Sequence, residues 1–291
     1  MNRNLSEISI IVDSGSTKTD WCLCGNGRQI CRIATQGINP VHQSADEISK
    51  IIAMELLPSM AGKVLECGFI LSDVGRVEFY GAGCRGEGIE TMRQILSVVF
   101  SGTTHILVGS DLLAAAHAVF AGEEGIACIL GTGANSGLYD GKEIVENVSP
   151  LGYILGDEGS GAVLGKLFIN ELFKGDMPTA VREEFLKDSE LTLDEIINKV
   201  YRQPLANRFL ASLSKYIYKY IDEEKVENLV IRNFEDFFHR NIDHYDRRDL
   251  CVGAVGSIAY YYKSQLEKAA NRCGYKLGRV EKAPLDGLLQ R

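Results

Sequence analysis

The chain has 291 residues, 45% hydrophobic and 24% charged, so it is long enough for two domains and has the composition of a globular protein. Its formal net charge of −8 argues against nucleic acid or an anionic membrane surface as a partner. No apolar run approaches the roughly 20 residues of a membrane span, and the first residues lack a signal-peptide core, so we expect a cytoplasmic protein.

The first part of the chain alternates between strand and helix patterns. Strands are predicted at 8–12, 19–23 and 29–35, a helix at 44–60, strands at 64–71 and 76–81, a helix at 87–100 and a strand at 105–108. An alanine-rich helix over 112–121 is ended by Gly122. This alternation is typical of an α/β domain.

The same order of strands and turns recurs in the second half. A second set of strands is predicted from 126 to 148, and a nearly all-helical region from 161 to 243. In both halves an apolar strand leads into a small-residue turn, a second strand and a tight hairpin, at Gly25-Asn26-Gly27 and at Asp140-Gly141. The recurrence predicts a duplicated α/β fold with a hinge between 111 and 122.

The two small-residue turns have the composition of phosphate-binding loops. The first contains Ser14, Gly15, Ser16 and Thr17, and the second contains Gly131, Thr132 and Gly133. Residues without bulk allow backbone N–H groups to approach a phosphate chain closely. Neither turn matches the Walker pattern, and neither opens directly into a long helix as a Rossmann turn does. The pair together predicts an enzyme that uses ATP.

Asp13 ends the first strand, directly before the first turn. A carboxylate beside phosphates requires a cation, and Mg²⁺ keeps several waters while binding few protein carboxylates. Asp13 is therefore a candidate for a water-mediated contact with Mg²⁺. The alternative is that both turns are ordinary hairpin corners and that Asp13 bonds to its own turn.

Three segments, in this order, carry a resemblance to a known family: 13–19, 131–135 and Gly156-Asp157-Glu158-Gly159-Ser160-Gly161. Together they resemble the BadF/BadG/BcrA/BcrD ATPase family, and within it the N-acetylglucosamine kinases of the actin/hexokinase superfamily. The resemblance extends to 251–257, which is similar to the family's adenosine-binding turn, and to 284–289. Ser14 stands where relatives often have glycine, and Ala134 where they often have serine, but both residues are small.

The resemblance implies a duplicated ribonuclease H-like, actin-like ATPase fold with an interdomain cleft. The first domain is expected at 1–112, with 280–291 as a segment that could join it, and the second at 113–279 with a helical insertion. It also implies a role for individual residues. Adenosine would contact Gly253, Gly256 and Ser257, the sugar would contact Asn39, Asp111, Thr132, Asn135 and Asp157, and Asp111 would be the catalytic base.

Simpler roles remain open for several of these residues. Asp is a preferred helix N-cap, so Asp111 could serve the helix that follows it. Asn39 precedes Pro40 and could be a turn residue. Lys18 could contact a phosphate, although an exposed hairpin lysine is the simpler interpretation.

The expected function is an ATP- and Mg²⁺-dependent kinase that phosphorylates the 6-hydroxyl of N-acetylglucosamine or a related amino sugar. One alternative is an ATPase that activates a partner enzyme and carries an iron–sulfur cluster, for which the eight cysteines show no ligand spacing. Another is a sugar-binding regulator that has lost catalysis. The apolar helical faces between 167 and 242 make a homodimer reasonable.

Overall fold

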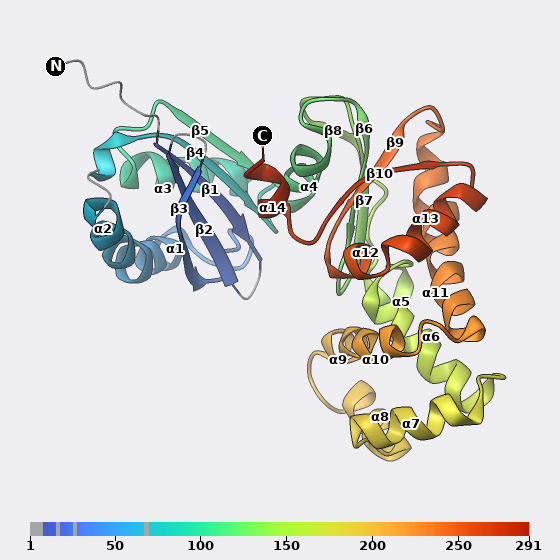
Figure 1. The fold of residues 1–291 in the computed structure, drawn as a ribbon. Helices are drawn as coiled ribbons and strands as arrows, with labels where there is room; N and C mark the ends of the chain where they lie inside the picture. Colours follow the sequence, from blue (N-terminus) through green and yellow to red (C-terminus); the bar gives the residue numbers. More distant parts are fainter. Residues whose placement is uncertain (1–7, 16–17, 26–27, 67–69, 291) are drawn as a thin grey trace. The chain divides into compact units, whose positions relative to one another are not determined.

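The computed structural model describes residues 8–15, 18–25, 28–66 and 70–290 (Figure 1). The chain divides into two compact units, Met1–Ala118 with Pro284–Arg291 (unit 1) and Val119–Ala283 (unit 2). Each unit is built on one five-stranded mixed sheet. The strand order β3-β2-β1-β4-β5 of unit 1 recurs as β8-β7-β6-β9-β10 in unit 2, so the predicted duplication and the α/β class are confirmed.

In the sheet of unit 1, β1 pairs antiparallel with β2 and parallel with β4, and β4 is parallel to β5. The strands are β1 (Ile8–Ser14), β2 (Lys18–Gly25), β3 (Arg28–Gln36), β4 (Val74–Gly81) and β5 (His105–Gly109). The main helices are α1 (Ala45–Ile51), α2 (Leu57–Glu66), α3 (Glu87–Val99), α4 (Asp111–Phe120) and α14 (Pro284–Leu288).

The core of unit 1 explains why β1 reads as an almost continuous apolar run. Ile8, Ile10 and Val12 on one face are fully buried, and Ile11 on the other face is buried as well, as expected for a central strand covered on both faces. In β2, Trp21 packs against Phe79 of β4 with ring centroids 5.8 Å apart. Burying a large apolar side chain contributes about 1.5–3 kcal/mol, so these contacts fix the central strands and the positions of their ends.

The strand predicted at 64–71 is wrong for the part that the structure describes. A π-helical turn at Ile52–Leu56 joins α1 to α2, and the helix runs on to Glu66; a short 3₁₀ turn occupies Leu71–Asp73. Buried Ile48, Ile52, Leu56 and Met60 recur every four residues and hold this helical segment to the core. A short apolar run after such a stripe does not distinguish strand from helix by periodicity.

In the sheet of unit 2, β6 pairs antiparallel with β7 and parallel with β9, and β9 is parallel to β10. The strands are β6 (Gly125–Leu130), β7 (Ala134–Tyr139), β8 (Ile144–Glu146), β9 (Cys251–Val255) and β10 (Lys276–Glu281). The helices α12 (Ser257–Tyr261) and α13 (Lys263–Arg272) lie between β9 and β10 in the chain.

A helical region separates β8 from β9 and confirms the prediction for 161–243. It contains α5 (Gly152–Leu155), α6 (Gly161–Lys174), α7 (Thr179–Ser189), α8 (Leu193–Tyr201), α9 (Ala206–Ser212), α10 (Ser214–Lys219) and α11 (Glu224–Phe237). Within unit 2, α7 and α8 lie far from the sheet in Figure 1, beyond α6. The buried rings of Phe168 and Phe185, with centroids 5.4 Å apart, join α6 to α7.

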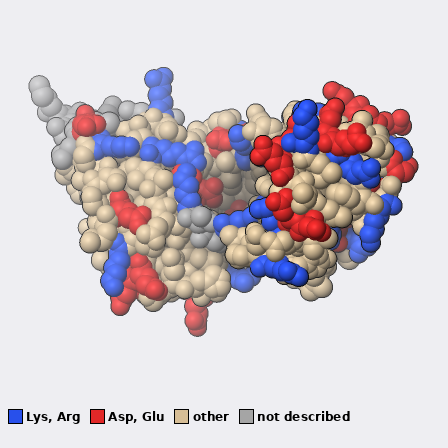
Figure 2. Space-filling view, turned by 90° about the horizontal axis from the view of Figure 1, so that it is seen from below, with Lys and Arg blue, Asp and Glu red and all other residues tan. Residues whose placement is uncertain are grey.

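The surface is mixed in charge. On the face drawn in Figure 2, acidic and basic side chains of the described residues are interspersed. Among the described residues, no helix has the length and apolar character needed to cross a membrane.

Candidate active site

In unit 1, the predicted site residues gather at the carboxyl ends of parallel strands. β1, β4 and β5 run parallel, so their carboxyl ends lie at one edge of the sheet. Asp13 is near the end of β1, Gly83 follows β4 and Asp111 follows β5. In open α/β sheets, ligands bind in the crevice outside this edge.

Asp13 is half-buried among other acids. Burial first, and then the negative charges of Asp20 and Asp111, raise the pKa of its carboxyl group to about 6, against an opposing effect of Arg32. A cation would relieve this repulsion, and carboxylate oxygens are the hard donors that Mg²⁺ accepts. Among the described residues, no group of three or more His, Cys, Asp or Glu side chains forms a metal cage. A site with one carboxylate and several waters suits Mg²⁺ better than it suits an ion that needs many protein ligands.

Two cations neutralise Asp20, the residue paired with Asp13 across β1 and β2. The Lys18 ammonium lies 2.7 Å from one Asp20 oxygen, and the Arg32 guanidinium lies 3.0 Å from the other. Burial opposes ionisation of Asp20, but these partners outweigh it and hold its pKa below the ordinary value. The side chain of Lys18 is therefore engaged with Asp20.

The first predicted phosphate turn is anchored by a buried hydroxyl. Ser14 is 1% exposed, and its hydroxyl lies 2.6 Å from the Thr19 hydroxyl and donates to the Ile38 carbonyl at 2.8 Å. The exposed Gly15 donates its N–H to the carbonyl of Lys18 at 2.9 Å. The predicted Ser16 and Thr17 lie outside the described residues. Ser14 thus ties the turn to the loop that carries Asn39.

Asn39 lies against the loop that follows β4. Its side-chain oxygen accepts from the Val41 N–H at 3.0 Å, and its own N–H donates to Gln43 Oε1 at 2.8 Å. Gly83 has φ +84°, and a Cβ there would lie 2.1 Å from the Asn39 oxygen. Only glycine suits this position, and its absence of a side chain lets Asn39 approach the edge of the sheet.

Asp111 begins α4 but does not cap it. Ser110 has that role, since its hydroxyl accepts from the N–H of Leu113 at 3.1 Å. The Asp111 carboxylate accepts from the N–H of Leu112 at 2.9 Å. Burial raises the pKa of Asp111, partly offset by N–H groups of Leu112 and Asp111 and by the charge of Arg85. A carboxylate with a raised pKa is a better proton acceptor.

In unit 2, two predicted turns meet at the corresponding edge. β6 and β9 are parallel, and Gly131 and Gly256 each follow the end of one of them. Gly256 has φ +122°, and a Cβ there would lie 2.2 Å from the carbonyl oxygen of Leu130. Glycine therefore allows the turn before Ser257 to lie directly against the end of β6 at Leu130, next to the turn at 131–133.

The loop before α6 also lies against the turn at 131–133. The N–H groups of Gly161 and Ala162 donate to the carbonyls of Gly131 and Thr132 at 2.8 and 3.1 Å. The Asp157 carboxylate would lie 2.9 Å from a Cβ at Gly133. Burial raises its pKa, against the opposing effect of the N–H groups of Gly152 and Ala134.

Asn135, in β7, is held through its side chain. Its oxygen accepts from the Asn147 amide at 2.9 Å and from the N–H of Ser136 at 2.9 Å.

Gly253, the first of the predicted adenosine residues, lies inside β9, where a Cβ would be 2.5 Å from a methyl group of Val119. Within unit 2, the structure therefore brings together Thr132, Gly133 and Asp157, with Gly256 beside them.

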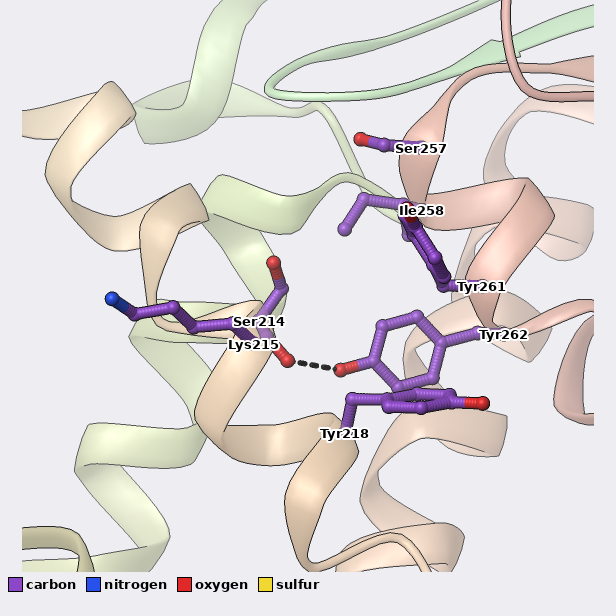
Figure 3. Close-up of a pocket in the computed structure, with 7 residues that line it drawn as sticks. All are labelled: Ser214, Lys215, Tyr218, Ser257, Ile258, Tyr261 and Tyr262. Carbon is purple, nitrogen blue, oxygen red and sulfur yellow. Dashed lines mark hydrogen bonds between the residues drawn. The ribbon is translucent and has the colours of Figure 1, made fainter. Parts of the chain in front are cut away.

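A cavity of about 260 Å³ opens next to Ser257 (Figure 3). It is lined by Ser214, Lys215, Tyr218, Ser257, Ile258, Tyr261 and Tyr262. The Tyr262 hydroxyl donates to the Ser214 carbonyl at 2.5 Å and joins α10 to the end of α12. Sequence reasoning found Ser257 but missed the aromatic wall, although the run Tyr260-Tyr261-Tyr262 was a visible signal.

Comparison with solved structures gives likenesses both in sequence and in fold. A candidate N-acetylglucosamine kinase from Porphyromonas gingivalis is 46% identical, with 97% of each chain covered and a TM-score of 0.85. A candidate N-acetylglucosamine kinase from Chromobacterium violaceum is 18% identical over 98% of each chain, with a TM-score of 0.68. A glucokinase of the ROK family from Streptomyces griseus, solved with glucose and AMPPNP, is 14% identical over 97% of each chain, with a TM-score of 0.53.

The two remote likenesses show the fold alone, whereas the first extends to the sequence. No model of a known protein family matches the chain, and no curated protein matches it.

Proposed function

The chain belongs to the family of N-acetylglucosamine kinase-like proteins with the actin-like ATPase fold, and from this premise we propose that it is an ATP-dependent sugar kinase. The proposed substrate is an amino sugar, N-acetylglucosamine, phosphorylated on its 6-hydroxyl. The observation that carries the proposal is 46% identity over 97% of a candidate N-acetylglucosamine kinase.

Asp111 is the proposed catalytic base. Phosphoryl transfer to a hydroxyl requires a carboxylate that orients the nucleophile and accepts its proton. The raised pKa of Asp111 suits proton acceptance. Because Ser110 caps α4, the carboxylate of Asp111 is not required at the helix end.

The phosphates of ATP are the proposed ligands of the turns at Gly15 and at 131–133. Both turns follow the carboxyl end of a central strand and present small residues there. Asp13 would hold Mg²⁺, which when bound neutralises phosphate charge. Asp13→Asn should then raise the Mg²⁺ concentration needed for half-maximal activity.

For the sugar, unit 1 offers Asn39 and Asp111, and unit 2 offers Thr132, Asn135 and Asp157. Carboxylate, amide and hydroxyl groups suit a polyol because each sugar hydroxyl both donates and accepts. The side-chain oxygens of Asn39 and Asn135 already accept backbone N–H groups, which fixes the orientation of both amides.

The test is ATP-to-ADP conversion with Mg²⁺ over a panel of hexoses and amino sugars, with the product identified by mass spectrometry. We expect turnover with N-acetylglucosamine and a product heavier by one phosphoryl group. Hydrolysis that ignores every sugar would contradict the proposal and favour an ATPase that activates a partner enzyme. Saturable sugar binding without phosphoryl transfer would favour a sugar-binding regulator.

A further inference from the structure

The cavity beside Ser257 has an aromatic and aliphatic wall that suits a planar ring. Tyr218 lies edge-on to Tyr262, with ring centroids 5.5 Å apart and planes at 81°, and 6.1 Å from Tyr261 at 63°. Ile258 points toward the same space in Figure 3. A volume of about 260 Å³ is below the roughly 300–1,000 Å³ of pockets for whole drug-sized ligands, so it suits one ring system.

The cavity is joined to the proposed phosphate turn. Ser257 begins α12, and Gly256 just before it lies against the carbonyl of Leu130, next to Gly131. A nucleotide with its phosphates at 131–133 can therefore place its base against α10 and α12 within the same unit.

Few polar groups of the cavity are available to a ligand. The Tyr262 hydroxyl and the Ser214 carbonyl are bonded to each other. In Figure 3 the Lys215 side chain points away from the other labelled residues, and its ammonium lies 4.7 Å from the ring centroid of Tyr216. The side-chain hydroxyls of two serines and two tyrosines remain (Ser214, Ser257, Tyr218 and Tyr261), and the seven lining residues include no Asp, Glu, Asn or Gln.

We propose that this cavity binds the purine base of the nucleotide by its shape and by stacking, and that it does not distinguish purines by the hydrogen-bonding groups at their edge. The inference rests on the proposed kinase function. Adenine presents a donor amino group and an acceptor nitrogen, while guanine and hypoxanthine present a carbonyl and a donor N–H. A serine or tyrosine hydroxyl rotates and serves either pattern, as donor or as acceptor. Strong rejection, about 10⁴–10⁵-fold, needs fixed polar groups that the wrong ligand leaves unpaired. GTP and ITP should therefore replace ATP.

The experiment measures kcat/KM for ATP, GTP, ITP and CTP at saturating sugar and Mg²⁺. The expected result is that the three purine nucleotides agree within about 10-fold, while CTP, with a smaller ring, falls by about 10–200-fold as in other apolar pockets. A preference for ATP over GTP greater than about 10³-fold would overturn the inference. No phosphoryl transfer from any nucleotide would instead contradict the proposed function.

Variants separate stacking from edge recognition. Tyr218→Leu should raise KM for ATP and GTP by the same factor, because it removes a ring from the wall together with a hydroxyl that serves either purine equally. Ser214→Ala should leave the ATP-to-GTP ratio of kcat/KM unchanged. Tyr201→Ala is the control, since this tyrosine of α8 is 81% exposed and outside the cavity. The inference fails if Tyr218→Leu leaves both KM values unchanged in a normally folded protein, or if Ser214→Ala shifts the ratio about 10-fold.

Discussion

The two units share one strand order but differ in what they carry at the carboxyl ends of their strands. Unit 1 presents the carboxylates of Asp13, Asp20 and Asp111 near one another. Unit 2 presents a glycine and threonine turn, with Asp157 against it. The chain between the third and fourth strands also differs, occupying 37–73 in unit 1 and 147–250 in unit 2. A duplicated sheet thus provides two equivalent edges, and the loops determine their chemistry.

The largest expected difference between the two edges concerns Asp111. Asp111→Asn should lower kcat by about 10²–10⁴-fold, because the amide cannot accept the proton of the sugar hydroxyl. KM for ATP and sugar should change little, and the melting temperature should be retained because Ser110 caps α4. Steady-state kinetics and thermal unfolding measure both quantities.

The matched control is Asp194→Asn, an exposed aspartate in the first turn of α8. It makes the same chemical change at another helix start and should keep full activity. Near-normal turnover of Asp111→Asn would remove Asp111 from the mechanism and make the acidic edge of unit 1 a structural feature.

Gly256 tests the packing that joins two turns of unit 2. Gly256→Ala should destabilise the protein by about 1–3 kcal/mol, because alanine at φ +122° is strained and its Cβ would meet the Leu130 carbonyl at 2.2 Å. Urea unfolding measures the change. Gly62→Ala is the control, since a Cβ there meets nothing within 4 Å, and in the interior of α2 alanine should stabilise by about 0.5–1 kcal/mol. Equal stability of Gly256→Ala and the parent would show that the turn can shift.

Gly131 separates folding from phosphate binding at the same edge. A Cβ at Gly131 would meet nothing within 4 Å, so Gly131→Ala should fold normally. If the turn holds phosphate through its backbone, the added methyl group should raise KM for ATP by about 10-fold, equivalent to roughly 1.4 kcal/mol. KM for the sugar serves as the internal control. An unchanged KM for ATP would move the phosphates away from this turn.

How far the sequence predicted this arrangement depends on the range of the interactions involved. The duplication and the strand pairs were predictable, because Asp-Gly and small-residue turns act within a few residues. The predicted turn at Asn26-Gly27 lies outside the described residues. The contact of Gly256 with Leu130 and the aromatic wall of the cavity join residues far apart in the chain. Periodicity carries no information on such contacts, and it also failed at 64–66, where a helix continues.

The sequence before Asp111 contains the signal for the helix cap that the structure shows. Serine is as good an N-cap as aspartate, and the preceding Ser110 fits the N-cap position for Leu113, so this detail was available from sequence alone. The effect of the Arg85 charge on the pKa of Asp111 could not be predicted from the sequence, because the two residues follow different strands. The candidate base was thus located by its motif, while its electrostatic setting required the fold.

The smallest expected difference concerns two serine helix caps, Ser110 of α4 and Ser160 of α6. Each hydroxyl accepts a backbone N–H three residues on, at 3.1 Å. Ser→Ala at an N-cap costs about 0.5–2 kcal/mol. Ser160 is fully buried, so the freed N–H of Val163 cannot turn to water, whereas Ser110 is half-buried. Ser160→Ala should therefore lie near the upper end of this range and Ser110→Ala near the lower end, as measured by urea unfolding. The reverse order would mean that the buried start of α6 relaxes enough for the Val163 N–H to find another acceptor. The sheet edges of units 1 and 2 would then differ in rigidity as well as in chemistry.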